Sequence, residues 1–282
     1  MSESERPLDE LVRYQVDNGV ARITIDRPEA GNALTAAMRD RLAELFEVVS
    51  TTLAVRTVLL TGTGKAFCTG ADLRGAQAPA SPLPGNEPPP GAPERSAGDG
   101  ARMIRRGWQR LVTAVLDAEK PVVCALNGTA AGGGAHLALA CDLIVMAEEA
   151  RLIEVFVRRG ILPDAGGCFI LPRIVGVQRA KEIMFFGDDV GAATAERIGL
   201  VNTVVPGSEL EKTAAQWAER LAAGPTKAIA LTKWLLNRSL DSDRLTAFQE
   251  ESWAQEVVTG TEDCKEGRAS FAERRPPAFK GW

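Results

Sequence analysis

Asn127-Gly-Thr-Ala-Ala-Gly-Gly-Gly-Ala-His136 is the stretch of sequence that decides the fold of this chain. The short apolar run before it, residues 121–126, is typical of a buried strand, and residues 137–140 after it are typical of the first turns of an apolar helix. A strand, a glycine-rich turn and a helix start in this order gather backbone N–H groups at a positive helix end, which favours negative charge. Glycine also lets a ligand approach the backbone closely. This stretch alone is equally consistent with a turn that binds a ligand and with a tightly packed turn that binds nothing.

Composition restricts the class of protein. The chain has 282 residues, of which 45% are hydrophobic and 25% charged, so a core of ordinary size is expected without disulfides. The net charge is −4 and the basic residues are scattered, which argues against a nucleic-acid partner. No apolar run is long enough to span a bilayer, and the first residues lack the apolar segment of a secretory signal, so we expect a cytoplasmic protein with no membrane partner. The odd number of cysteines without paired spacing predicts reduced thiols and no metal site.

The first half of the chain predicts alternating strands and helices. Alternation on both sides of Asn18-Gly19 predicts a hairpin over residues 13–26. Thr35 is expected to cap a helix whose apolar face carries Met38, Leu42, Leu45, Phe46 and Val49. Further elements are expected at residues 57–61 (strand), 102–118 (helix) and 142–147 (strand).

The second half predicts mainly helices. They are expected at residues 178–186, 194–198, 209–223, 226–238, 244–258 and 262–273, with one strand at 201–205 between them. This order predicts an α/β layer fold with a C-terminal helical extension. We therefore divide the chain into a core, residues 1–205, and a helical segment, residues 206–282. Residues 76–100 are rich in Pro, Gly, Ala and Ser and are expected to form a mobile loop within the core.

Three segments together resemble the crotonase family, the enoyl-CoA hydratase/isomerase superfamily. They are Arg27-Pro-Glu-Ala-Gly-Asn-Ala-Leu-Thr35, Gly64-Lys-Ala-Phe-Cys-Thr-Gly-Ala-Asp-Leu73 and the glycine-rich stretch quoted above; Pro163-Asp-Ala-Gly-Gly167 and the end of the chain look similar too. The resemblance implies a spiral of ββα units, a C-terminal α-helical trimerisation segment, and a homotrimer or a dimer of trimers. It also implies an acyl-CoA thioester substrate, a place in fatty acid metabolism, and no cofactor beyond the CoA moiety of the substrate.

The resemblance also assigns an oxyanion hole. By motif match, the backbone N–H groups of Cys68 and Gly133 would hold the thioester oxygen when it becomes negatively charged. Such a donor is worth about 3–4 kcal/mol in measured oxyanion holes. Only the backbone of Cys68 would be needed, and we expect its thiol to be a packing group and not a nucleophile.

CoA contacts are carried over in the same way. The segment from Ala66 to Leu73, together with Ala33 and Leu34, would line the path of the pantetheine and adenine. Lys65 and Lys280 are candidates for the CoA phosphates, and a solvated surface charge is the alternative for each. The substrate-binding set is therefore Ala33, Leu34, Ala66, Cys68, Thr69, Gly70, Ala71, Asp72, Leu73, Gly133, Phe156 and Lys280.

The acid–base residues depart from the hydratase pattern. Family hydratases carry glutamates three and twenty-three positions after the second oxyanion glycine, and these positions here hold His136 and Phe156. A phenyl ring cannot transfer a proton, so the pattern favours an isomerase. Asp164 lies where several family isomerases use an aspartate; a single carboxylate there could move a proton from C2 to C4 of an enoyl-CoA. The alternative for Asp164 is a cap of the following glycine turn.

Two rival functions stay open. The first is a hydratase, a lyase that adds water to a 2-enoyl-CoA, using His136 with Glu154 or Asp164. Glu154 would share a face with the vacant carboxylate position at Phe156 if the backbone is extended there. His136 could otherwise be a buried structural histidine. The second rival is a non-enzymatic acyl-CoA binder.

Overall fold

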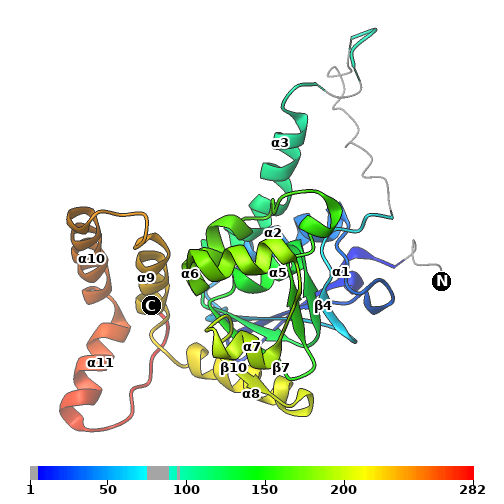
Figure 1. Ribbon diagram of the computed structural model, residues 1–282. Helices are drawn as coiled ribbons and strands as arrows, with labels where there is room; N and C mark the ends of the chain where they lie inside the picture. Colours follow the sequence, from blue (N-terminus) through cyan, green and yellow to red (C-terminus); the bar gives the residue numbers. More distant parts are fainter. Residues whose placement is uncertain (1–5, 75–88, 94–95) are drawn as a thin grey trace.

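The computed structural model describes residues 6–74, 89–93 and 96–282 and contains two sheets. Most of the loop predicted at residues 76–100 lies outside these ranges, and its last two residues begin helix α3. The six-stranded sheet has the order β1-β2-β3-β5-β7-β10, and the four-stranded sheet has the order β4-β6-β8-β9. Most helices pack around these two sheets, whereas α3 projects away from them and a group at the C-terminus stands apart (Figure 1).

The six-stranded sheet carries the core. Its strands are β1 (Val12–Asp17), β2 (Val20–Ile25), β3 (Thr57–Gly62), β5 (Val122–Leu126), β7 (Leu143–Ala147) and β10 (Thr203–Val205). β1 and β2 form the predicted antiparallel hairpin, and Asn18 and Gly19 at its turn both have positive φ, as a two-residue turn of this kind requires. The other neighbours are parallel. β3 and β5 are buried along their whole length, which explains their continuous apolar sequences.

The four-stranded sheet was not predicted. Its strands are β4 (Ala66–Cys68), β6 (Thr129–Ala131), β8 (Arg151–Ile153) and β9 (Asp189–Gly191). Three residues are too few to show a period of two, so sequence pattern could not reveal them. β4, β6 and β8 follow β3, β5 and β7 after short loops, so the chain repeats a long strand, a short strand and a helix. This repeat is the expected spiral of ββα units.

The predicted helices of the first half are present, one of them interrupted, and two short helices before residue 31 were not predicted. The helices of this half are α1 (Leu8–Leu11), η2 (Pro28–Ala30), α2 (Ala36–Thr51), α3 (Asp99–Ile104), η3 (Arg105–Gln109), α4 (Arg110–Leu116) and α5 (Gly133–Leu139). The Thr35 side chain caps α2 as predicted, by accepting from the Met38 N–H. The helix predicted over residues 102–118 is interrupted at Gly107, whose φ and ψ are not helical. α5 begins within the glycine triplet and is entirely buried.

Helices of the second half agree with the prediction except at the first of them. They are η4 (Val157–Arg159), α6 (Gly167–Phe186), α7 (Ala192–Arg197), α8 (Gly207–Ala222), α9 (Thr226–Arg238), α10 (Arg244–Thr259) and α11 (Glu262–Glu273). α6 begins at Gly167, earlier than predicted, and Pro172 and the non-helical Gly176 within it hid its first part from the sequence pattern. α8 packs against β3, β5 and β7, whereas α9, α10 and α11 form the separate group. Within the described ranges, no helix has the length and apolar character needed to cross a bilayer.

A buried ion pair fastens the C-terminal helices to the core. The Lys233 ammonium on α9 lies 2.9 Å from the Asp142 carboxylate, and Lys233 is only 7% exposed. The ammonium also donates to the carbonyls of Val115 and Lys120. Burial raises the pKa of the Asp142 carboxyl, and the charge of Lys233 opposes that rise. Removing Lys233 would therefore leave a buried carboxylate without its counter-charge.

We predict that Lys233→Met lowers the free energy of unfolding by about 3–5 kcal/mol at neutral pH, because one partner of a buried pair is lost. A raised pKa means that the folded protein binds the proton of Asp142 more tightly than the unfolded chain does. The loss of stability in Lys233→Met should therefore shrink as pH falls through the titration of this carboxyl. Denaturant unfolding monitored by circular dichroism at several pH values measures both effects.

The matched control is Lys227→Met on the same helix. Lys227 lies 3.3 Å from Glu119 in an exposed pair, so this variant should lose only about 0–1 kcal/mol. Equal losses in the two variants, or a Lys233→Met deficit that does not depend on pH, would contradict the role given to the buried pair.

Candidate active site

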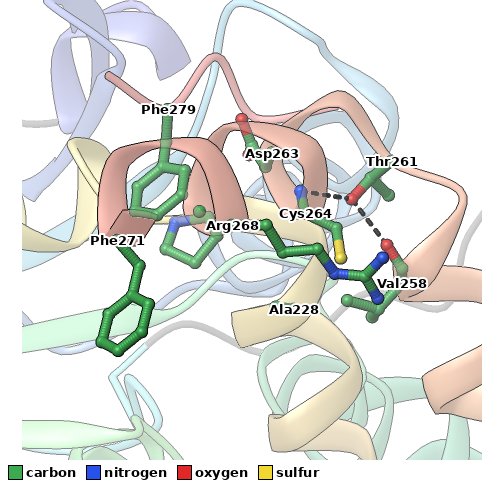
Figure 2. A pocket seen from close by; sticks show the side chains of 10 residues that line it. Ala228, Val258, Thr261, Asp263, Cys264, Arg268, Phe271 and Phe279 are labelled. Atoms are coloured by element: carbon green, nitrogen blue, oxygen red, sulfur yellow. Dashed lines mark hydrogen bonds between the residues drawn. The ribbon is translucent and has the colours of Figure 1, made fainter. Parts of the chain in front are cut away.

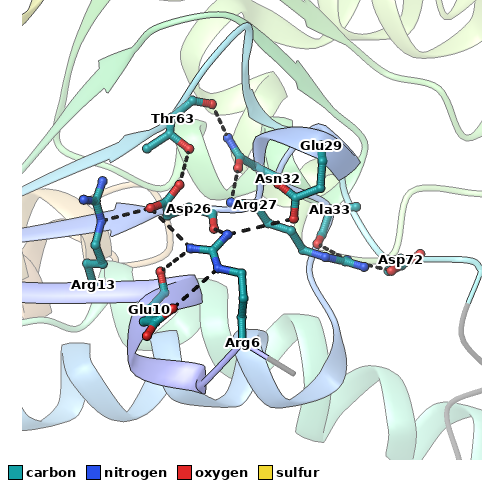
Figure 3. A network of polar contacts seen from close by, with 10 residues as sticks. All are labelled: Arg6, Glu10, Arg13, Asp26, Arg27, Glu29, Asn32, Ala33, Thr63 and Asp72. Atoms are coloured by element: carbon teal, nitrogen blue, oxygen red, sulfur yellow. Dashed lines mark hydrogen bonds and ion pairs between the residues drawn. The ribbon is translucent and has the colours of Figure 1, made fainter. Parts of the chain in front are cut away.

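A fully buried asparagine ties together the first two of the three sequence segments quoted above. The Asn32 side-chain oxygen accepts from the Arg27 N–H at 2.8 Å, and its amide donates to the Thr63 carbonyl at 2.8 Å (Figure 3). The same amide donates to the Ala66 carbonyl at 2.7 Å. Asn32 is 0% exposed and has a positive φ of 56°, a conformation that asparagine tolerates better than most residues. The loop after β2 is therefore fixed against the start of β4.

A buried ion pair joins the same loop to the residues after β4. The Arg27 guanidinium lies 2.6 Å from the Asp72 carboxylate and also donates to the Ala33 carbonyl. The pKa of Asp72 is lowered, first by the hydrogen bond from the Arg74 backbone N–H and further by Arg27, while burial opposes these effects. The Asp72 side chain is thus engaged within the protein, and a CoA contact at this position would come from its backbone.

The predicted CoA-binding residues before and after β4 lie side by side. Leu34 and Ala71 form a parallel bridge, with the Leu34 N–H donating to the Gly70 carbonyl at 2.8 Å and the Asp72 N–H donating to the Leu34 carbonyl at 2.9 Å. This arrangement places Ala33, Leu34 and the segment from Ala66 to Leu73 on one continuous strip. Lys65, just before β4, is exposed.

Lys280 lies far from this strip in the single chain. Its backbone N–H donates to the Asp263 carboxylate on α11, and the end of the chain lies beside α9, away from β4 (Figure 1). The contact of Lys280 with CoA stays a prediction.

The end of β4 and the start of α5 are in direct contact. A Cβ added to Gly134 would lie 2.0 Å from the Cys68 carbonyl oxygen, and a Cβ on Gly70 would lie 3.0 Å from the Ala131 carbonyl oxygen and 3.6 Å from the Gly133 nitrogen. Only glycine fits at Gly134 without moving the backbone. Gly133 is the first residue of α5, so its N–H has no acceptor within the helix. The two segments that carry the proposed oxyanion donors, Cys68 and Gly133, are therefore neighbours.

The Cys68 thiol is a packing group. Its residue is 0% exposed, and burial raises the pKa of the thiol to about 12, although the Gly70 N–H partly opposes the rise. A thiol with this pKa is neutral near pH 7 and is not a nucleophile. Among the residues that the structure describes, no group of three or more His, Cys, Asp or Glu side chains is arranged to hold a metal.

His136 and Glu154 form a buried pair. The His136 Nε2 lies 3.0 Å and 3.1 Å from the two carboxylate oxygens of Glu154, and the side chains are 0% and 4% exposed. Glu154 directly follows β8, but residues 155 and 156 form a turn and Phe156 has helical φ and ψ, so the extended backbone that the alternative required is absent. The imidazole also stacks on Phe156, with ring centroids 5.2 Å apart. In the described part of the chain, the buried Nδ1 of His136 has no hydrogen-bond partner.

The loop of Asp164 leads into the segment that covers this pair. A Cβ on Gly167, three residues after Asp164, would lie only 2.0 Å from the His136 Nε2, so the start of α6 covers the imidazole. Asp164 is half-buried, and its carboxylate has no hydrogen bond or ion pair with any described residue. Its backbone carbonyl accepts from the Gln109 side-chain amide at 3.3 Å. The structure therefore brings His136, Glu154 and Phe156 together, and it places the loop of Asp164 directly before the part of α6 that covers the imidazole.

Two nearby residues could not be identified as site residues from the sequence. Trp108, in η3, packs directly on Gly133, and Gln109 holds the backbone of Asp164. Both lie in a stretch that the pattern predicted as an ordinary helix, and no feature of that pattern separates them from its other residues. Only the long-range contacts identify them.

A hollow of about 400 Å³ lies elsewhere, between α9 and α11 (Figure 2). Its lining is mainly apolar and includes Pro225, Ala228, Val258, Cys264, Phe271 and Phe279. The Asp263 carboxylate at its edge is already engaged by the backbone N–H groups of Lys280 and Gly281. Because none of the three segments that carry the family resemblance lines this hollow, we place the chemistry at the β4–α5 contact.

The thiol assignment gives a prediction that does not depend on function. Brief treatment of the native protein with iodoacetamide at about pH 8 should alkylate the exposed Cys168 at least about tenfold faster than Cys68, because Cys68 is buried and its pKa is raised further. Peptide mass spectrometry after quenching measures both rates. Protein unfolded in guanidinium should label all cysteines and serves as the control; equal native rates would show that the thiol is accessible and ionised.

Comparison with known proteins agrees with this architecture. The family model described as enoyl-CoA hydratase/isomerase matches residues 15–83 and 93–282. The chain is 33% identical over 273 residues to the 1,2-epoxyphenylacetyl-CoA isomerase of Escherichia coli, covering 96% of this chain and 99% of that one. It is 34% identical over 273 residues to the (E)-benzylidenesuccinyl-CoA hydratase of Thauera aromatica, with 96% and 99% covered. The crystal structure of an enoyl-CoA hydratase from Bacillus anthracis superposes with a TM-score of 0.85 at 32% identity, covering 96% of this chain and all of that one. The chain therefore belongs to the enoyl-CoA hydratase/isomerase family, the crotonase superfamily, with the crotonase fold.

Proposed function

We propose that this protein shifts the double bond of an enoyl-CoA thioester. Asp164 takes the proton from C2, the backbone N–H groups of Cys68 and Gly133 hold the enolate oxygen, and Asp164 returns the proton at C4. The observation that carries the proposal is the half-buried Asp164 carboxylate, which lacks a partner among the described residues and stands three residues before Gly167, the residue that packs on the His136 imidazole.

The two amides supply the electrostatic part of catalysis. Removing a proton from C2 moves negative charge onto the thioester oxygen, and backbone donors that are already in place stabilise this charge without having to reorganise. The close contact of Gly134 with the Cys68 carbonyl fixes the two segments relative to each other. Each donor would contribute about 3–4 kcal/mol, by analogy with measured oxyanion holes.

The carboxylate of Asp164 supplies the proton transfer. One base that keeps the abstracted proton is enough for a shift of the double bond, whereas the addition of water needs groups that activate the water and protonate C2. Phe156 cannot serve as the second group. The Gln109 hydrogen bond to the Asp164 carbonyl orients the backbone but leaves the carboxylate available.

A hydratase is the second candidate, and the His136–Glu154 pair favours it. A carboxylate 3.0 Å from the imidazole fixes the orientation of the ring, as in other acid–base pairs. A water activated by His136 and a proton from Asp164 would complete the addition. We rank it second because both oxygens of Glu154 already face His136 and the residue is 3% exposed.

The remaining parts of the proposal concern CoA and assembly. CoA would follow the strip from Ala33 to Leu73, with no further cofactor, and the free cysteines agree with a cytoplasmic location. We also propose a homotrimer or a dimer of trimers. Large apolar side chains are exposed on α6, α9 and α10, and an assembly would cover them; they are Phe185, Phe186, Leu236, Leu245, Phe248 and Trp253.

We predict that Asp164→Asn lowers kcat for 3-hexenoyl-CoA by about 10²–10⁴-fold, because the amide cannot accept the C2 proton. Binding of butyryl-CoA should change little, since the substituted group has nearly the same shape. The conjugated 2-enoyl product is followed by its ultraviolet absorbance, and mass spectrometry should show a product with the mass of the substrate.

Glu154→Gln is the matched control, because it replaces a second carboxylate of the cluster by its amide. An isomerase should lose far more activity in Asp164→Asn than in Glu154→Gln. A product heavier by one water, formed from crotonyl-CoA and lost in Glu154→Gln, would identify the hydratase instead. Binding of acyl-CoA without turnover of either substrate would identify a binder.

A further inference from the structure

An indole ring covers the glycine that carries the second proposed oxyanion donor. Three ring carbons of Trp108, Cε3, Cζ3 and Cη2, lie 2.8 Å from the position that a Cβ on Gly133 would occupy. Trp108 is half-buried and follows Gly107, the residue at which the helix is interrupted. The ring therefore faces the backbone at the point where a thioester oxygen would bind.

A second aromatic ring contacts the preceding glycine. The Cζ and Cε2 atoms of Phe156 lie 3.6 Å and 3.8 Å from the position of a Cβ on Gly132. The other stacking contact of Phe156 is with His136, at an interplanar angle of 13°. Two consecutive glycines at the start of α5 are thus each covered by an aromatic ring, and the fully buried imidazole of His136 supports the phenyl ring by stacking on it.

The residue after Trp108 connects this aromatic cover to the proposed base. The Gln109 amide donates to the Asp164 carbonyl at 3.3 Å, so η3 contacts both the oxyanion glycine and the loop of Asp164. An acyl group whose oxygen lies at Gly133 and whose C2 faces Asp164 would extend beneath the segment that carries the indole.

We propose that Trp108, together with Phe156, selects acyl groups that carry an aromatic ring close to the thioester. Flat π-systems gain offset or edge-to-face contacts with indole and phenyl rings beyond the burial of area, and an alkyl chain gains only the burial. This inference rests on the proposed function for the place of the acyl group. It assigns Trp108 as a specificity-determining residue.

The test compares two CoA esters that have no double bond to shift. Isothermal titration should show that the protein binds phenylacetyl-CoA about tenfold tighter than butyryl-CoA. Trp108→Leu should weaken phenylacetyl-CoA binding about tenfold and change butyryl-CoA binding by less than about threefold, whereas Trp108→Phe should keep most of the preference. The matched control is Trp217→Leu on α8, which should leave both affinities unchanged. Trp217 is also half-buried, but it packs against the core.

Two outcomes would overturn the assignment. If Trp108→Leu weakened the binding of both esters equally, the indole would serve the structure of the site and not its specificity. If the variant bound both esters more tightly, the indole would hinder binding. Because the esters do not react, the result is independent of turnover. A wild-type protein with the aryl preference that fails to convert 3-hexenoyl-CoA and 5-phenyl-3-pentenoyl-CoA would refute the isomerase proposal and leave the role of Trp108 intact.

Discussion

The close approach of α5 to the end of β4 is the constraint on which the rest of the structure depends. The Gly134 Cα lies so near the Cys68 carbonyl that a Cβ would be 2.0 Å from the oxygen. No side chain can be accommodated there, so the glycine triplet is a packing requirement before it is a binding feature. Because this contact holds the end of β4 against the start of α5, it sets the relative position of the Cys68 and Gly133 amides. The chemistry proposed for the site depends on that position.

Buried polar contacts hold the other side of the site. Asn32 satisfies three backbone groups of two loops, and the Arg27–Asp72 pair connects the loop after β2 to the segment after β4. Groups of this kind cost stability when one partner is lost, but when all are satisfied they specify a single arrangement of loops. The strip assigned to CoA is thus built from backbone held by side chains that face inward.

Much of the fold could be predicted from the sequence, because long elements leave strong patterns. The hairpin around Asn18-Gly19, the helix capped by Thr35 and the helices α9 and α11 all appear where periodicity and capping place them. The short strands of the four-stranded sheet left no period to detect. The break at Gly107 and the early start of α6 were hidden because glycine and proline within a helix look like boundaries.

The candidate site divides in the same way. Family motifs assigned the segments of Cys68, Gly133 and Asp164, and the structure brings these segments together. The pairing of His136 with Glu154 is one alternative among several in the sequence, since spacing along the chain does not show which side chains meet between a helix and the end of a strand. Trp108 could not be found at all, because its contact with Gly133 depends on the kink of η3.

The most direct test of the central claim is a crystal structure with acetoacetyl-CoA, an ester that forms an enolate readily. The account predicts that the thioester oxygen lies about 2.7–3.2 Å from both the Cys68 and the Gly133 backbone nitrogens. A thioester oxygen that binds elsewhere, or that contacts only side chains while these two amides point away from it, would contradict the account.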